Sequence, residues 1–188
     1  MATELRTEQG KAFVPSGTWK VDPAHSSVEF SVKHLMIATV KGRFTDFDGT
    51  IEVGETPATA KAHAVIKAAS IDTHEENRDQ HLRSPDFFDV EKFPEITFDS
   101  KRIEQLDDAS FRVVGDLTIK GVTREVELDG TVEGAERDPW GNDRVALELR
   151  GEIDRNDFEL RWNQNLERGG VLVGDRVRLA IDVSAVKS

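Results

Sequence analysis

The sequence predicts an all-β protein whose strands form an antiparallel barrel of about eight strands. Apolar and polar residues alternate along about nine segments, which is the pattern of strands with one buried face. Only residues 72–88 and 156–170 interrupt this alternation, so helices and strands do not alternate as in α/β proteins. Glycines recur on the apolar side of several segments, as the bends of a closing barrel require.

The first two segments lie before residue 36. TWKVD is the first, and residues 25–35 form the second, with Val28, Phe30 and Val32 on one face. His34 has the same parity, so its side chain is expected to point inward near the end of the strand. There it could be a hydrogen-bonded core histidine, or it could face the polar head of a ligand.

The next two segments are residues 39–53 and 59–70. In the first, the apolar parity changes from even to odd numbers after Phe44, which predicts a β-bulge near Thr45 and Asp46. In the second, alanines alternate with polar residues, and Ile66 shares their face.

Five later segments repeat the alternation, at residues 95–103, 110–121, 125–134, 144–153 and 175–183. Their apolar faces are expected to line the interior of the barrel. These faces include Phe98, Phe111, Val113, Gly115, Leu117, Leu128, Gly130 and Leu147.

The small residues on the apolar faces leave two interpretations open. A barrel of about eight strands is just wide enough to be filled by side chains or to hold one small ligand. Glycines and alanines favour a ligand cavity, whereas a fully packed barrel with kinked strands would use the glycines only for bending. The glycines concerned are Gly42, Gly49, Gly115, Gly130 and Gly151.

Length and charge narrow the class of protein. The 188 residues suit one domain, which we place at residues 17–188, after a flexible N-terminal tail at residues 1–16. The net charge of −11 argues against a nucleic-acid partner, because phosphate binding needs a basic surface. No segment approaches the roughly 20 apolar residues of a membrane span. The N-terminus lacks a signal-peptide pattern, so we expect a cytoplasmic protein.

Residues 74–89 are the part of the chain richest in groups capable of chemistry. His74 and His81 would lie roughly 10 Å apart on one helix, which is too far to share a zinc ion. The chain has no cysteine, and it lacks the G-x-S-x-G motif and the nucleotide-binding glycine motifs. We therefore expect no metal, no cofactor and no catalytic residue.

A structural role for the same stretch is the simpler interpretation. It is expected to form a short helix or turn followed by a second turn, in which Phe87 and Phe88 cover an apolar opening. Arg78, Asp79 and His81 would then tie this loop to the ends of strands by hydrogen bonds.

Several motifs together resemble a known family. WKVDPAHSSVEFSVKHL, VKGRFTDFDGTI, RDQHLRSPDFFDVEKFPEITF, GDLTIKGVTREVEL and VGDRVRLAIDV are similar to the YceI-like family of lipocalin-type polyisoprenoid-binding proteins. The resemblance extends from about Gly17 to Val183. It implies a lipocalin-like extended barrel, with short helical segments in its connections, around an apolar tunnel for isoprenoid, quinone-like or fatty-acyl molecules. It implies no enzymatic activity.

The family's polar motifs correspond to His34 and Leu35, and to the stretch from Arg78 to Leu82. The chain departs from the family pattern in two ways. Many members carry a secretion signal, which is not seen here, and a late motif similar to DFGL reads DFEL, with Glu159 in the place of glycine.

We therefore expect a protein that carries or sequesters an isoprenoid or another long-chain amphiphile. A hydrolase or isomerase using His34, Arg78, Asp79 and His81 is one alternative, and a ligand-free stress or interaction protein is another. An exposed barrel edge could pair two copies as a homodimer. The expected ligand-binding residues are Val28, Phe30, Val32, His34, Phe44, Ile66, Arg78, His81, Phe87, Phe98, Val113, Gly115, Leu117, Leu128, Gly130 and Leu147.

Overall fold

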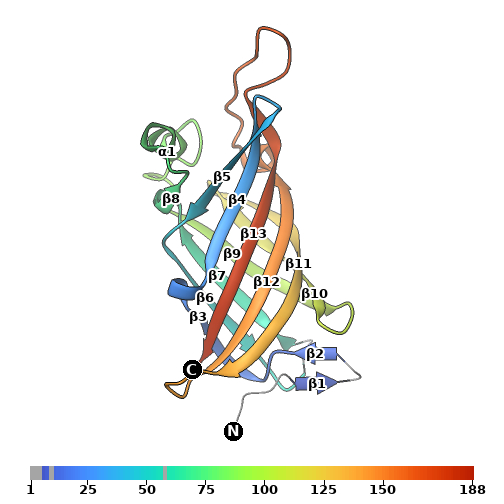
Figure 1. The fold of residues 1–188 in the computed structure, drawn as a ribbon. Coiled ribbons are helices and arrows are strands. Elements are labelled where there is room, and N and C mark those ends of the chain that lie inside the picture. Colours follow the sequence, from blue (N-terminus) through green and yellow to red (C-terminus); the bar gives the residue numbers. More distant parts are fainter. Residues whose placement is uncertain (1–5, 9–10, 57–58) are drawn as a thin grey trace.

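Eight antiparallel strands close into a barrel, as the sequence predicts (Figure 1). The computed structural model describes residues 6–8, 11–56 and 59–188, with side chains from residue 14 onward. Strand β12 pairs with both β11 and β13, and this double pairing closes the ring. The barrel strands, in spatial order, are β3 (Gly17–Val21), β6 (Phe47–Val53), β7 (Lys61–Lys67), β9 (Glu95–Gln105), β10 (Ser110–Ile119), β11 (Val122–Arg137), β12 (Asp143–Asp154) and β13 (Val173–Lys187).

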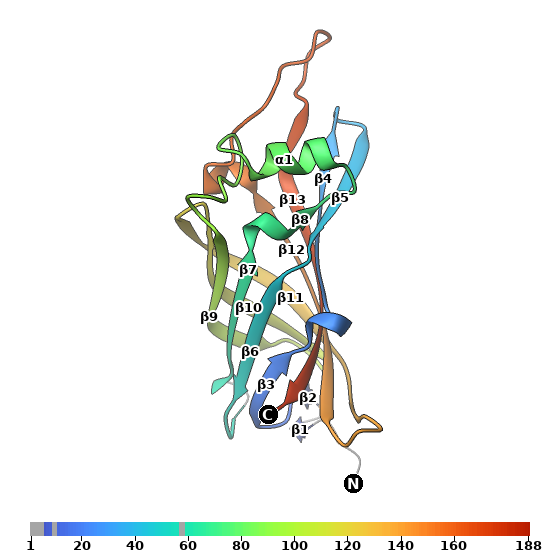
Figure 2. The same ribbon diagram turned by 90° about the vertical axis from the view of Figure 1, so that its left-hand side faces the viewer.

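A hairpin extends the barrel at one end. Strands β4 (Ser27–His34) and β5 (Ala38–Phe44) pair with each other, and β4 also pairs with β13. In Figures 1 and 2 this hairpin rises beyond the barrel at the end opposite the two termini. The short strand β8 (Ile71–Asp72) pairs with the base of β5.

The N-terminal region contains a separate small hairpin. Strands β1 (Arg6–Glu8) and β2 (Lys11–Phe13) pair with each other and not with the barrel. The flexible tail expected at residues 1–16 also covers residues 1–5 and 9–10, which lie outside the described residues. Its flexibility stays a prediction.

The parity change after Phe44 has a different cause from the bulge we expected. Strand β5 ends at Phe44 and β6 begins at Phe47, so Thr45 and Asp46 separate two strands rather than forming a bulge within one. Facing this break, the 3-10 helix η1 (Pro23–His25) separates β3 from β4. The wall of the barrel bends here because the break between β3 and β4 lies opposite the break between β5 and β6.

The end of the barrel near the termini is closed by a packed cluster. Trp19 is fully buried, and its indole Nε1 donates a hydrogen bond to the Pro15 carbonyl oxygen at 2.8 Å. An indole that is buried with its donor satisfied packs without an uncompensated polar group. The buried members of this cluster are Trp19, Val53, Val145 and Ala185.

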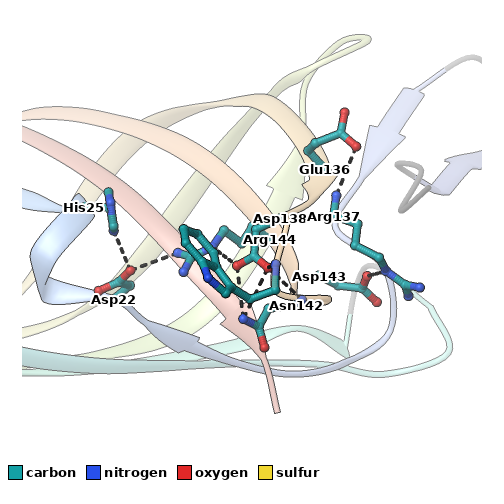
Figure 3. A network of polar contacts seen from close by, with 9 residues as sticks. Asp22, His25, Glu136, Arg137, Asp138, Asn142, Asp143 and Arg144 are labelled. Atoms are coloured by element: carbon teal, nitrogen blue, oxygen red, sulfur yellow. Dashed lines mark hydrogen bonds and ion pairs between the residues drawn. The ribbon is translucent and has the colours of Figure 1, made fainter. Parts of the chain in front are cut away.

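A polar network joins η1 to the β11–β12 turn on the outside of the same end (Figure 3). The Arg144 guanidinium donates to the carboxylates of Asp22 at 2.9 Å and Asp138 at 2.8 Å. Asp22 also contacts His25 and caps η1. The hydrogen bonds from Arg144 and then His25 lower the pKa of Asp22 to about 2, and Arg144 also lowers the pKa of Asp138.

Two short helical elements flank the opposite end of the barrel. The helix α1 (Glu76–Arg83) crosses this end in Figure 2, and the 3-10 helix η4 (Arg155–Phe158) follows β12. A further 3-10 helix, η3 (Ala68–Ser70), leads from β7 into β8. No helix in the described part of the chain is long and apolar enough to cross a membrane.

Candidate ligand-binding cavity

The barrel encloses an apolar cavity of about 290 Å³. This volume is far above the roughly 10–15 Å³ that admits one water molecule, and it lies near the lower end of the roughly 300–1,000 Å³ of small-molecule pockets. All eight barrel strands contribute to its lining, together with β4 and β5. None of the buried residues packed around Trp19 lines it, so the cavity stops before that end. The interior is therefore not filled by side chains.

Most of the expected ligand-binding residues line this cavity. Five do not: His34, Arg78, His81, Gly115 and Gly130. Whether the lining residues bind a ligand stays a prediction. They are Val28, Phe30, Val32, Phe44, Ile66, Phe87, Phe98, Val113, Leu117, Leu128 and Leu147.

The role expected for Gly115 and Gly130 is corrected by their surroundings. A Cβ on Gly130 would lie 2.3 Å from the Phe111 ring, and one on Gly115 would lie 2.6 Å from the Phe98 ring. Aromatic rings thus cover both glycines, and Phe98 and Phe111, which carry those rings, both line the cavity. The same relation joins Gly42 to Phe30. These glycines admit large side chains from neighbouring strands and do not themselves leave open space.

Small residues on β7, rather than these glycines, leave open volume in the cavity. Ala62, His63 and Ala64 line the cavity, whereas Val65, the next residue on the strand, does not. Ala64 lies opposite Gly49 of β6 and Phe98 of β9. A longer side chain at Ala64 would therefore enter the cavity.

Helix α1 is held over the barrel by a buried carboxylate. Asp79 is 4% exposed and accepts hydrogen bonds from the Thr73 backbone N–H at 2.9 Å and the Thr73 hydroxyl at 2.5 Å. Arg78 donates to the Thr73 hydroxyl and carbonyl oxygens, both at 2.8 Å. Glu75 caps the helix by accepting from the N–H groups of Asn77 and Arg78. The structural role predicted for Arg78 and Asp79 is therefore confirmed.

An aromatic cluster stands at the α1 end of the cavity. The His81 ring packs edge-on against Phe87, with centroids 5.1 Å apart, and against Trp162, with centroids 4.6 Å apart. Nε2 of His81 lies 2.8 Å from a carboxylate oxygen of Asp86. Phe87 is buried and lines the cavity, so this cluster borders the ligand space. Phe88, which also lines it, packs edge-on against Phe44.

Arg155 is the charged side chain most deeply buried beside the cavity. It is 4% exposed, and its guanidinium donates to the carbonyl oxygens of Leu160, Trp162 and Gly174. Burial lowers the pKa of this guanidinium, but arginine stays protonated in proteins. Because backbone carbonyls take its donors, Arg155 fixes the chain between η4 and β13 and is poorly placed to bind an anionic ligand.

The DFEL motif ends η4 in a strained conformation. Glu159 has φ 61°, in the left-handed region, and serves as the C-cap of the 3-10 helix. This region favours glycine, which has no Cβ to clash with the backbone. The backbone thus accommodates Glu159 at the site where the family motif has glycine, and the loop keeps its turn.

The residues of the enzymatic alternative do not form one cluster. Arg78 and Asp79 both bind Thr73, while His81 contacts Asp86. His34 lies at the end of β4 and is absent from the cavity lining. Among the residues with described side chains, no group of three or more metal-ligating residues could hold a metal ion.

Two residues of this site were missed by sequence reasoning. Trp162 and Arg155 lie in or beside the non-periodic segment 156–170, where alternation gives no information about orientation. The only signal was the DFEL motif between them, which marked an unusual loop.

Three comparisons with known proteins agree with this architecture. A model of the YceI-like domain matches residues 19–185. A UPF0312 protein of Staphylococcus aureus is 42% identical over 159 residues, which cover 84% of this chain and 90% of that protein. A Campylobacter jejuni YceI protein of known structure has a TM-score of 0.71 and 33% identity, over 83% of this chain and 90% of that one.

A more distant structure has the same fold. It is a polyisoprenoid binding domain from Saccharophagus degradans implicated in plant cell wall breakdown. The TM-score is 0.68 with 16% identity, over 90% of this chain and 98% of that one. At this identity the similarity concerns the fold alone.

Proposed function

The chain belongs to the YceI family, and from this premise we propose that it binds an isoprenoid or another long-chain amphiphile inside the barrel and carries or sequesters it. The observation that carries the proposal is the apolar cavity of about 290 Å³. Its wall has the character of a hydrocarbon-binding site, and it is closed at the Trp19 end. A domain of the same fold is described as polyisoprenoid binding.

The affinity would come from burial of the tail. Each buried methylene contributes about 0.8 kcal/mol, so a tail with ten of them gains roughly 8 kcal/mol before the costs of ordering and association. Apolar contact is non-directional, and selection among tails of similar length is therefore expected to be weak. Isoprenoid alcohols, isoprenoid quinones and fatty amides are all candidates.

The head group would lie near the α1 end. His81 and Trp162 offer polar edges beside Phe87, which lines the cavity. None of the three expected head-group residues, His34, Arg78 and His81, lines the cavity itself, but His81 contacts the lining residue Phe87. A small head of low charge suits this end best, because the donors of Arg155 are taken by the backbone.

The proposed function is binding of the ligand without any chemical change to it. The polar residues near α1 make separate pairs, which favours a structural role for them. If the protein is only a carrier, a ligand that it has taken up should be recovered chemically unchanged after organic extraction. Recovery of a hydrolysed or isomerised product would favour the enzymatic alternative instead. The cytoplasmic location and the homodimer remain predictions from the sequence.

The test is uptake of geranylgeraniol, measured by native mass spectrometry. We expect a one-to-one complex with the unaltered protein, and at least tenfold weaker uptake by Ala64→Phe, because the new ring occupies the cavity. Val65→Phe is the matched control, since Val65 is the next residue on β7 and does not line the cavity. An Ala64→Phe protein that folds and binds as well as the unaltered protein would contradict the proposal.

A further inference from the structure

Three consecutive apolar side chains are exposed at the tip of the β4–β5 hairpin. Leu35 is 40%, Met36 57% and Ile37 80% exposed. The backbone of Leu35 and Met36 is left-handed, with φ of 55° and 63°, and the Ile37 N–H donates to the His34 carbonyl oxygen. The turn therefore presents these side chains outward, and contiguous exposure of this kind commonly marks an interaction site.

The tip stands directly above the α1 end of the ligand cavity. Val32, three residues before Leu35 on the same hairpin, lines the cavity, and so does Val173 of β13. The Leu35 N–H donates to the Leu172 carbonyl oxygen at 2.9 Å, which joins the tip to the loop that precedes β13. Figure 1 shows this loop and the hairpin rising together beyond the barrel.

The charge around the tip is opposite to that of the whole molecule. Residues 31–41 and 161–178 carry six basic and two acidic side chains, in a chain with a net charge of −11. All eight of these charged side chains are exposed. Glu152 and Glu159, outside these segments, pair with three of the arginines. The basic residues are Lys33, Lys41, Arg161, Arg168, Arg176 and Arg178.

We propose that the hairpin tip inserts into the surface of an anionic lipid bilayer. A protruding apolar tip with basic side chains beside it matches a membrane interface, in which apolar groups enter the acyl boundary and cations contact anionic head groups. The inference rests on the proposed function, because a bilayer is where a long-chain amphiphile is dissolved. Docking here would bring the α1 end of the cavity to the lipid surface.

The test is flotation with vesicles of phosphatidylcholine, with or without phosphatidylglycerol. The protein should float with the anionic vesicles and much less with the neutral ones. The double variant Met36→Asn, Ile37→Ser places asparagine at position 36, because asparagine tolerates the left-handed conformation. Its partition coefficient into the anionic vesicles should be at least about tenfold lower than that of the unaltered protein. Arg168→Ala should lower partitioning into the anionic vesicles about fivefold, because the variant loses one cation that would contact anionic head groups.

Trp140→Ser is the matched control, because Trp140 is 81% exposed in the β11–β12 turn, which lies at the other end of the barrel. It should float like the unaltered protein. Failure to float with anionic vesicles, or equal flotation of the tip variant, would overturn the inference. So would loss of flotation in Trp140→Ser.

Geranylgeraniol uptake, measured in vesicle-free solution, separates this inference from the proposed function. The tip variant should take up the alcohol as the unaltered protein does. Uptake without flotation overturns membrane docking and leaves the carrier function standing. Flotation without uptake supports membrane docking while the carrier function fails.

Discussion

Contacts between aromatic rings and glycines shape the cavity at the residue scale. Because a Cβ on Gly130 would lie 2.3 Å from Phe111, Gly130→Ala should push that ring into the ligand space. We expect the free energy of unfolding to fall by about 1–3 kcal/mol, measured by urea denaturation. Gly134→Ala on the same strand is the control, since nothing lies within 4 Å of its position. Equal effects at both glycines would show that the ring contact is unimportant.

The left-handed residue at the end of η4 gives a second test at this scale. Glu159→Gly should leave the free energy of unfolding unchanged or raise it by up to about 1 kcal/mol, because glycine adopts φ 61° without strain. Glu159→Val should lower it, since a β-branched side chain is poorly suited to this conformation. Asp157→Gly, within η4, should cost roughly 0.5–1 kcal/mol. Thermal unfolding of the three variants ranks them, and a Glu159→Gly protein less stable than Asp157→Gly would contradict the argument.

Which residues face the interior was predictable where strands are regular, because side chains alternate faces. Phe30, Val113 and Leu128 were placed in this way and do line the cavity. The role of Gly115 was not predictable, since it depends on the register with the neighbouring strand. That register shifts between Val114 and Gly115, where β10 pairs with β9. A single sequence shows which residues share one face of a strand, but it does not show how that strand is aligned with the neighbouring strand.

At the scale of elements, the attachment of α1 depends on Asp79. Asp79→Ala removes the acceptor of two buried hydrogen bonds from Thr73. Leaving these donors unsatisfied should cost about 1–3 kcal/mol. Hydrogen exchange of the α1 amides should accelerate more than exchange of the barrel strands, because the helix loses its buried carboxylate contact with Thr73, although Arg78 and Arg83 keep their hydrogen bonds to Thr73 and Ile71.

Two further variants make this test specific to the buried carboxylate. Gln80→Ala changes an exposed neighbour on the same helix and should have little effect on exchange. Asp79→Asn keeps the shape and one acceptor oxygen, so it should fall between Asp79→Ala and the unaltered protein. If Asp79→Ala exchanges like Gln80→Ala, the buried carboxylate is not needed to hold α1, and apolar packing with the hydrogen bonds of Arg78 and Arg83 is sufficient.

The sequence located most elements but not every connection between them. The helix at Glu76–Arg83 falls inside the predicted non-strand segment 72–88. The interruption at Thr45 and Asp46 was interpreted as a bulge, because a parity change alone does not distinguish an inserted residue from a break between strands. The distinction depends on η1 in the neighbouring strand pair, which is a non-local feature.

At the scale of the whole molecule, closure of the barrel joins distant parts of the chain. Strand β13, the last in sequence, pairs with β3 and β4 near the start as well as with β12. The number of strands and the glycine bends predicted a closed barrel. Which end is packed by Trp19 and which is crossed by α1 could not be predicted, since it depends on where these two parts of the chain meet the ring of strands.

The ion network around Arg144 contributes a pH-dependent part of the overall stability (Figure 3). Asp22 has a folded-state pKa of about 2, below the ordinary value of 3.8, and the pKa of Asp138 is also lowered. A carboxyl group with a lowered pKa stabilises the fold fully above its unfolded-state pKa. This contribution is lost as the pH falls through the folded-state pKa. The relevant window therefore extends from about pH 5 down to about pH 2.

Arg144→Met should remove this pH-dependent contribution, because both carboxylates lose the guanidinium that lowers their pKa. The variant should be less stable than the unaltered protein at about pH 7, and the difference in the free energy of unfolding should shrink toward about pH 3. Urea denaturation at the two pH values measures it. Arg150→Met is the control, since its partners Glu148 and Asp182 are exposed, and such pairs contribute at most about 1 kcal/mol. A difference for Arg144→Met that stays constant or grows on acidification would mean that Arg144 acts through packing rather than through the two carboxylates.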